Sequence, residues 1–203
     1  PLGLLHRDIS PANILCGHQG LVKLTDFGIA GLARLRGDEF IVNRRGLSSQ
    51  SLPKTTGQIE DPSGIGENPL RVRGKVGYMS PEQARGEDID ARSDLFSAAV
   101  VLYEILVGER LFIGAAEGAT AAQIYSARVT PPSRRRSEVP QALDRVLLKA
   151  LSLNQEARYP SATALRAALL GVAQEAGLVL AAEALAEDLR VTCGATPEDW
   201  RRE

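Results

Sequence analysis

Apolar residues recur at helical spacing through most of the second half of the chain. The strongest apolar stretch runs from 95 to 107. It contains Ser97, Tyr103 and Glu104 and is too short to span a bilayer, so we expect a core helix there. The same periodicity predicts further helices at 117–128, 141–151, 161–176 with Pro160 just before the cap, and, more weakly, 181–190.

Shorter apolar runs dominate the beginning of the chain. Residues 14–16 and 21–25 flank a Gly-His-Gln-Gly segment at 17–20. Two such runs around a glycine-bounded turn predict a tight β-hairpin. Because a hairpin brings its two ends together, Asn13 and Asp26 should lie side by side.

Several stretches lack this regularity. Residues 37–74 are rich in glycine, serine, arginine and proline and predict a disordered insertion. The Pro-Pro-Ser-Arg-Arg-Arg stretch at 131–136 predicts a loop, whose basic run either is solvated, which we favour, or contacts an acidic partner. We expect one domain over 1–171 and a helical tail over 172–203. The tail either docks onto a partner or covers the fold, and we favour cover.

Composition is consistent with an ordinary folded domain. With 203 residues, 44% hydrophobic and 24% charged, the chain is long enough for one core. The net charge of -1 argues against nucleic acid as the main partner. No signal peptide or membrane-spanning segment is recognisable, and Cys16 and Cys193 do not suggest a disulfide framework. The cytoplasm is therefore the default location.

The candidate chemistry lies at the ends of the predicted hairpin. An H-R-D-x-x-x-x-N pattern spans 6–13, and a D-F-G pattern spans 26–28. With the hairpin between them, the two patterns bring Asp8, Asn13 and Asp26 together. Asn13 and Asp26 would each offer oxygen to Mg²⁺, which prefers hard oxygen ligands and few carboxylates. Asp8 is on the loop just before the hairpin, so its carboxylate should lie close to these two oxygens.

Three more motifs follow in order: Gly-Tyr-Met-Ser-Pro-Glu-Gln at 77–83, Asp-Ala-Arg-Ser-Asp-Leu-Phe-Ser at 90–97 and Ala-Arg-Tyr-Pro-Ser-Ala at 157–162. With this ordered set the chain resembles a protein kinase, and residues 78–83 look like those of bacterial, eukaryotic-like serine/threonine kinases. The resemblance implies a mainly α fold, the family's large C-terminal lobe, with a small β-hairpin next to the catalytic loop.

The resemblance also implies ATP and Mg²⁺ as cofactors. Asp8 would be the catalytic carboxylate, and Arg7 the arginine that a phosphorylated loop residue normally engages. Asn13 and Asp26 would bind the metal and, with it, the nucleotide. Leu15 would form the floor under the adenine ring.

Other residues would have structural roles by the same resemblance. Glu82 would pair with Arg158 and hold the end of the activation segment against the helical base. Asp94 would accept backbone N–H bonds from the turn that contains Asp8. His6 and Phe27 resemble the two stacked residues that the large lobe contributes to the active state. The structural set is His6, Phe27, Gly28, Glu82, Asp94 and Arg158.

Two positions depart from the family pattern. Ser10 stands where serine/threonine kinases usually have a lysine that neutralises the transferred phosphoryl group. Lys75 stands in the activation segment where the family usually has threonine. We hypothesise that Lys75 supplies the amine from the opposite side, within reach of Asp8. The alternative is an exposed lysine and a crippled site.

The activation segment is long. Asp26 to Glu82 spans 57 residues, and no serine or threonine lies between Ser63 and Ser80. Regulation by one well-placed loop phosphate is therefore doubtful. Candidate sites at longer range are Ser48, Ser49, Ser51, Thr55, Thr56 and Ser63.

The family's small lobe supplies a glycine-rich loop, a strand lysine and a helix glutamate, and none is recognisable in these 203 residues. We therefore expect the large lobe alone, with half of an ATP site. An apolar face around Leu15 and Phe27 would then be exposed, and the missing small lobe or a partner would cover it. The isolated chain should transfer phosphate negligibly.

The favoured function is that of a protein serine/threonine kinase catalytic lobe, which in the intact protein transfers the ATP γ-phosphate to Ser/Thr hydroxyls of a protein substrate. Residues 9–12 differ from the Ala-Ala-Arg or Arg-Ala-Ala segment common in tyrosine kinases. Two alternatives stay open: a pseudokinase-like binding module and a truncated gene remnant. Intact Asp8, Asn13 and Asp26 argue against a pure binding module.

Overall fold

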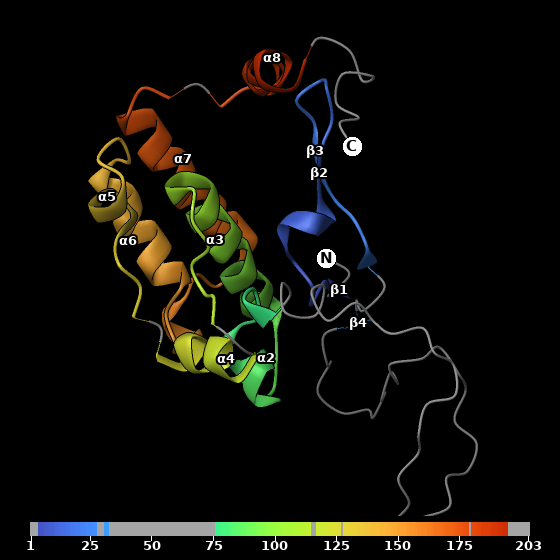
Figure 1. The fold of residues 1–203 in the computed structure, drawn as a ribbon, viewed down its shortest axis with the longest axis vertical. Helices are drawn as coiled ribbons and strands as arrows, with labels where there is room; N and C mark the ends of the chain where they lie inside the picture. Colours follow the sequence, from blue (N-terminus) through green and yellow to red (C-terminus); the bar gives the residue numbers. More distant parts are fainter. Residues whose placement is uncertain are drawn as a thin grey trace, which may run out of the picture.

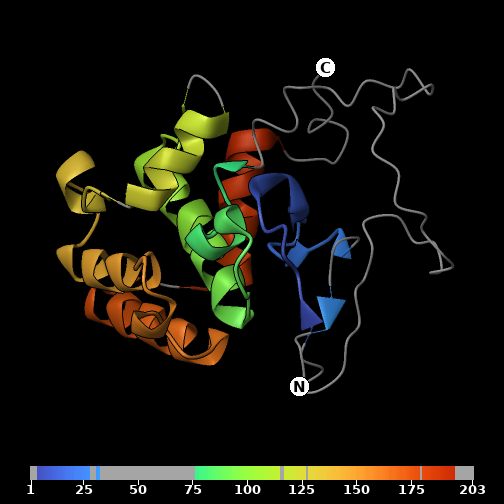
Figure 2. The same ribbon diagram turned by 90° about the horizontal axis from the view of Figure 1, so that it is seen from below.

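Helices α2 to α7 form one body, and the short strands lie beside it (Figures 1 and 2). The structure, a computed structural model, describes residues 4–27, 31–32, 76–114, 117–126, 128–178 and 180–194. This mainly helical arrangement with a small hairpin confirms the predicted fold class. The predicted insertion at 37–74 lies outside the described residues, as do Gly28 and Lys75.

The elements follow one another in a simple order. They are β1 Leu4–Leu5, the 3₁₀ turn η1 Pro11–Asn13, β2 Ile14–Cys16, β3 Val22–Leu24, β4 Gly31–Leu32, α2 Pro81–Arg85, α3 Ala91–Val107, α4 Glu117–Ser126, α5 Pro132–Arg135, α6 Gln141–Ala150, the 3₁₀ turn η3 Gln155–Ala157, α7 Ala162–Glu175 and α8 Ala182–Cys193.

The predicted hairpin is formed by β2 and β3, which pair antiparallel with Ile14 opposite Leu24 and Cys16 opposite Val22. The connecting turn closes through a 2.8 Å bond from the Gly20 amide to the Gly17 carbonyl. Gly20 has φ +74°, a conformation that costs glycine little. A second antiparallel pair joins β1 to β4, which the sequence pattern did not predict.

The core is built around α3. Phe96 and Val100 of α3 are fully buried with Ile124 of α4 and Leu147 of α6. Removing each such side chain from water stabilises the fold by about 1.5–3 kcal/mol. The helix begins four residues before the apolar stretch because the Asp90 carboxylate accepts the Arg92 amide at 2.8 Å and caps it.

The remaining helices begin and end close to the predicted positions, except in one place. The loop predicted for 131–136 is wrong, because Pro132–Arg135 forms helix α5. Proline suits the first helical position, and Asp144 of α6 accepts both the Ser133 amide at 3.0 Å and its hydroxyl at 2.6 Å. A carboxylate 11 residues away thus satisfies a donor that the local sequence leaves open.

Helix α7 begins at the expected cap, since the Ser161 hydroxyl accepts the Ala164 amide at 3.1 Å. It continues to Glu175, so the domain boundary expected after residue 171 falls inside this helix. Among the described residues, no helix is long and apolar enough to cross a membrane.

Candidate active site

The turn that carries Asp8 is held by the first turn of α3. The amides of His6 and Arg7 donate to the two carboxylate oxygens of Asp94, each at 2.8 Å. Arg7 has φ +66°, a left-handed conformation that a non-glycine side chain adopts only when its surroundings require it. Asp94 therefore fixes the backbone immediately before Asp8.

His6 joins this turn to the far end of the hairpin. His6 is 97% buried, its Nε2 lies 2.9 Å from the Thr25 carbonyl oxygen, and its Nδ1 accepts the Asp8 amide at 3.3 Å. Because the carbonyl can only accept, Nε2 carries the hydrogen. The Phe27 ring tilts against His6 with centroids 4.7 Å apart, so the two residues expected to stack are in contact.

Asn13 connects the catalytic turn to the hairpin. Its side-chain amide donates to the Asp8 carbonyl at 2.7 Å and to the Asp8 carboxylate at 3.1 Å. Its carbonyl accepts the Thr25 amide at 2.8 Å, one residue before Asp26. Asp8, Asn13 and the Asp26 backbone therefore converge at the base of the hairpin.

This donor set suits Mg²⁺. Because the Asn13 amide nitrogen is turned toward Asp8, its side-chain oxygen faces away from that bond. An amide oxygen and a carboxylate are the hard ligands that Mg²⁺ takes together with water and substrate phosphates. Asp26 has φ +62° and is, with Arg7, the second site residue in a left-handed conformation. Among the described residues, no group of three or more His, Cys, Asp or Glu side chains is placed as metal ligands.

Both residues expected to form an apolar surface beside the site are exposed. Leu15 of β2 is 55% exposed and Phe27 is 49% exposed. Large apolar groups left in water cost free energy that a bound ring or a covering protein surface would recover.

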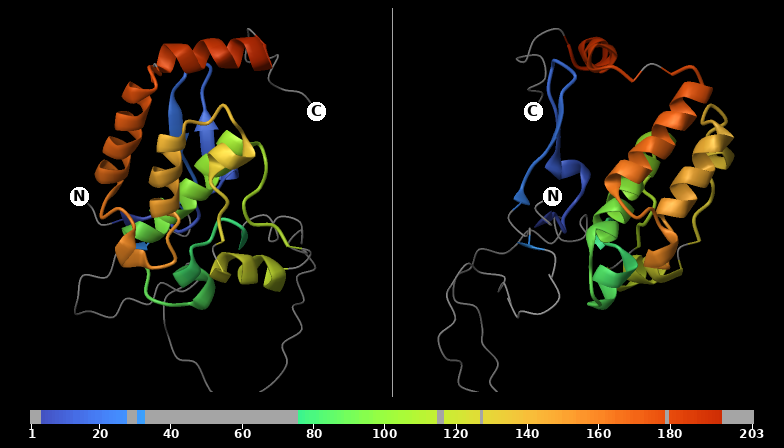
Figure 3. Two further views of the ribbon diagram at one scale, coloured as in Figure 1. Left: turned by 90° about the vertical axis from the view of Figure 1, so that its left-hand side faces the viewer. Right: turned by 180° about the vertical axis from the view of Figure 1, so that it is seen from behind.

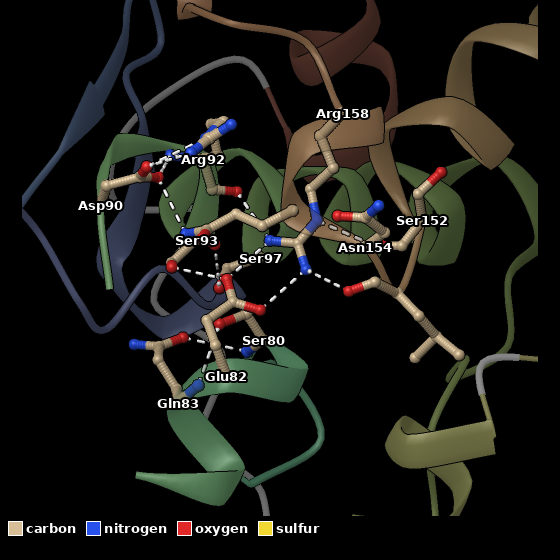
Figure 4. A network of polar contacts seen from close by, with 12 residues as sticks. Ser80, Glu82, Gln83, Asp90, Arg92, Ser93, Ser97, Ser152, Asn154 and Arg158 are labelled. Atoms are coloured by element: carbon tan, nitrogen blue, oxygen red, sulfur yellow. Dashed lines mark hydrogen bonds and ion pairs between the residues drawn. The ribbon is translucent and has the colours of Figure 1, made fainter. Parts of the chain in front are cut away.

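The Glu82–Arg158 pair implied by the resemblance is formed, and it is buried (Figure 4). The guanidinium donates to both carboxylate oxygens at 2.6 and 2.8 Å, and the Ser93 hydroxyl adds a third bond at 2.6 Å. Burial alone would raise the pKa of Glu82, but the hydrogen bonds from Arg158 and Ser93 lower it to about 2. The pair therefore joins α2 to the loop before α7 as an ionised pair.

Gln83 is a site residue that the sequence analysis missed. Its side-chain amide donates to the Arg7 carbonyl at 3.0 Å, while its side-chain oxygen accepts the Ser80 amide at 2.9 Å (Figure 4 shows the second bond). The Ser-x-x-Gln spacing predicts a capping box at the start of α2. Nothing in that spacing indicates that the same side chain also reaches the catalytic turn.

Tyr78 was also missed. Its hydroxyl donates to the Glu104 carboxylate at 2.7 Å, and Glu104 also accepts the Leu111 amide at 3.3 Å. Burial, and then the bond to Glu104, raise the pKa of Tyr78 well above its usual range. The segment before α2 is thereby tied to the end of α3.

Ser10 is placed differently from a phosphate-binding side chain. It is 97% buried, and its hydroxyl is one of two buried side-chain atoms without a hydrogen-bond partner among the described residues, the other being Nε of Arg7. An unpaired buried hydroxyl costs about 1–3 kcal/mol. The proposed exchange between Ser10 and Lys75 is not described by the structure, because Lys75 lies outside it.

Comparison with known proteins agrees with this geometry. Residues 2–170 match the protein kinase domain family, so the chain belongs to that family. It is 42% identical over 170 residues to serine/threonine-protein kinase PknB of Mycolicibacterium smegmatis. The matched segment is 84% of this chain and 23% of that protein. It is 40% identical over 170 residues, with the same coverage, to PknB of Mycobacterium leprae.

Another relative of similar identity is named as a tyrosine kinase. The chain is 37% identical over 169 residues to tyrosine-protein kinase MasK of Myxococcus xanthus, covering 83% of this chain and 22% of that protein. The chain thus spans less than a quarter of the length of the curated relatives it matches.

Proposed function

We propose that this chain is the catalytic large lobe of a protein serine/threonine kinase, which transfers the γ-phosphate of ATP to protein Ser/Thr hydroxyls. One observation carries the proposal. The side-chain amide of Asn13 donates to the Asp8 carboxylate, and the backbone carbonyl of Asn13 accepts the amide of Thr25, the residue before Asp26. A carboxylate for the nucleophile and two oxygen ligands for Mg²⁺ thus share one hydrogen-bonded unit.

Each residue has a role in the proposed reaction. Asp8 orients the substrate hydroxyl and accepts its proton, while Asn13 holds the Asp8 carboxylate in place. Asn13 and Asp26 hold Mg²⁺, which when bound neutralises charge on the phosphate oxygens. Leu15 packs under the adenine ring, and the small lobe or a partner covers the apolar face that Leu15 shares with Phe27. We keep Lys75 as the candidate phosphoryl-neutralising amine and Arg7 as the candidate phosphate-binding arginine.

The proposed substrate class rests on residues 9–12, which differ from the tyrosine-kinase pattern, and on the similarity to the serine/threonine-protein kinases PknB. The similarity to MasK makes the tyrosine hydroxyl the alternative acceptor to be tested. Ser10 favours a binding module with weak or absent turnover, because it stands where the family usually has a phosphoryl-neutralising lysine and its buried hydroxyl has no partner among the described residues.

The test is an Asp8→Asn substitution in the complete gene product, with transfer of labelled phosphate from ATP to a mixed protein substrate as the readout. Loss of the carboxylate should lower transfer by about 10²–10⁴-fold, the usual contribution of a positioned acid or base. Phosphoamino-acid analysis should find phosphoserine or phosphothreonine. The matched control is Asp88→Asn, an exposed aspartate between α2 and α3.

Two results would overturn the proposal. Equal transfer by Asp8→Asn and wild type would remove Asp8 from the reaction, and the absence of any transfer would favour the binding module. The 203-residue chain is assayed beside the gene product, and for this chain alone we expect negligible transfer.

A further inference from the structure

The β2–β3 hairpin carries the candidate metal ligands at its base but has little support along its length. Leu15 and Val22 are each 55% exposed, and Cys16 is also exposed. An open pocket of about 400 Å³ separates the hairpin from the second half of α3, with Ile14 and Cys16 on one side and Val101 and Ile105 on the other. Ile14 packs against the helical core at the base of the hairpin, whereas Leu15, Cys16 and Val22, nearer its tip, are exposed.

Its tip is held instead by α8. Gly20 is buried, and a Cβ atom built there would overlap the Ala182 carbonyl oxygen and lie 3.0 Å from the Ala186 nitrogen. Ala186 is itself only 6% exposed. The turn and the helix thus meet backbone to backbone, with no side chain between them. Figures 1 and 3 show α8 lying across the tip of the hairpin.

Residues 176–181 join the end of α7 to the start of α8, which is the same end of α8 that meets the hairpin tip. Helix α7 ends in a turn in which the Gly177 amide donates to the Gln174 carbonyl at 3.1 Å and the Leu178 amide to the Ala173 carbonyl at 2.8 Å. The chain then crosses to α8 (Figure 3). Helix α8 lies beyond residues 2–170, the part that matches the kinase family.

We propose that α8 is a brace that positions the hairpin, and with it Asn13 and Asp26, for binding Mg²⁺ with ATP. This rests on the proposed function. Because β2 and β3 are hydrogen-bonded to each other from base to tip, a displacement of the turn at Gly20 also displaces Asn13 and Asp26 at the base. Mg²⁺ demands near-ideal octahedral geometry, so its affinity falls when two ligands shift together. Gly20, Ala182 and Ala186 are positioning residues, since none of them reaches the metal.

The test uses two identical substitutions in the complete gene product. Ala186→Arg forces a long charged side chain into the contact with the turn. Ala184→Arg is the matched control, because Ala184 is exposed and lies about 200° away around the same helix. Gly20→Ala is the second variant and attacks the contact from the hairpin side.

Two readouts distinguish loss of the contact between α8 and the hairpin turn from its effect on Mg²⁺ binding. The first is amide hydrogen exchange without nucleotide, in which Ala186→Arg and Gly20→Ala should speed exchange at 14–24 at least tenfold and leave α3 unchanged. The second is the Mg²⁺ concentration that gives half-maximal binding of a fluorescent ATP analogue. It should rise at least fivefold in both variants and stay within twofold of wild type in Ala184→Arg.

Each result decides between the alternatives. Unchanged exchange in both variants overturns the α8 contact, whatever the activity. Faster exchange with an unchanged Mg²⁺ requirement overturns the positioning role and leaves α8 as cover. A wild-type protein that binds nucleotide but transfers no phosphate overturns the proposed function while the brace stands. A wild type that binds no nucleotide overturns both the proposed function and the positioning role.

Discussion

At the scale of single residues, the Glu82–Arg158 pair shows how a charge is kept inside this fold. Both side chains are almost fully buried, and the guanidinium also donates to the Ser152 carbonyl at 2.8 Å and lies 4.8 Å from the Phe96 ring centre. Desolvation opposes such a pair, so its stability depends on completing every bond. Here the Ser93 hydroxyl completes the carboxylate side.

Glu82→Gln should therefore destabilise the protein by about 3–5 kcal/mol, because the Arg158 charge remains buried without a counter-charge. Denaturant unfolding at pH 7 measures the change. The control is Glu87→Gln, whose side chain is 54% exposed and pairs with Arg85 at 3.1 Å. Surface pairs of this kind contribute about 0–1 kcal/mol. Equal losses in the two variants would contradict the assigned importance of the buried pair.

The same substitution makes a prediction about pH. The pKa of Glu82 is lowered in the folded state from 4.5 to about 2, so folding favours the ionised form. The stabilisation is full above about pH 5 and is lost as the pH falls toward the folded pKa. Between pH 5 and 2.5 the free energy of unfolding should therefore drop less in Glu82→Gln than in wild type. The difference between the two drops should be on the order of 2–3 kcal/mol.

At the scale of elements, α3 joins the hydrophobic core to the candidate active site. Its buried side holds Phe96 and Val100, while Asp94 in its first turn accepts the amides of His6 and Arg7. A carboxylate in the first turn also interacts favourably with the helix dipole. The helix therefore transmits the rigidity of the core to the turn that carries Asp8.

Asp94→Asn tests this link. An amide side chain keeps one acceptor oxygen but turns an NH₂ group toward the second backbone N–H, leaving one buried donor unpaired. We expect a stability loss of about 1–3 kcal/mol and faster amide exchange at His6 and Arg7. Phosphoryl transfer should fall at least about tenfold, since misplacing a reacting group by about 1 Å costs more than that. Asp88→Asn is the control, and exchange at His6 and Arg7 as slow as in wild type would contradict the link.

Elements were predicted well where the reason was local. The hairpin follows from two short apolar runs around a glycine turn, and it brings Asn13 next to Thr25 and Asp26 as expected. The helix at 132–135 was missed because its cap, Asp144, comes from another helix. Long-range bonds such as Gln83 to Arg7 depend on how α2 is placed, which no local spacing encodes.

At the scale of the whole molecule, stability and site geometry reside in different places. One continuous core joins α3, α4, α6 and α7, whereas the hairpin touches this core through Ile14 at its base, is exposed at Leu15, Cys16 and Val22, and meets α8 at its tip. The α8 contact could not be predicted from the sequence, because it is made by glycine and alanine backbones and leaves no hydrophobic signal. The helical core, in contrast, could be predicted from periodicity alone.

This separation predicts opposite behaviour for a core variant and a brace variant. Leu147→Ala, at a fully buried position, should cost about 2–5 kcal/mol in the free energy of unfolding. Leu180→Ala, at a 65% exposed position, should cost less than about 0.5 kcal/mol.

Below its unfolding transition, Leu147→Ala should keep the wild-type Mg²⁺ requirement for nucleotide binding, whereas Ala186→Arg should raise that requirement with little loss of global stability. If Leu147→Ala raised the Mg²⁺ requirement as much as Ala186→Arg, the hairpin would be held by the core as a whole and not by α8.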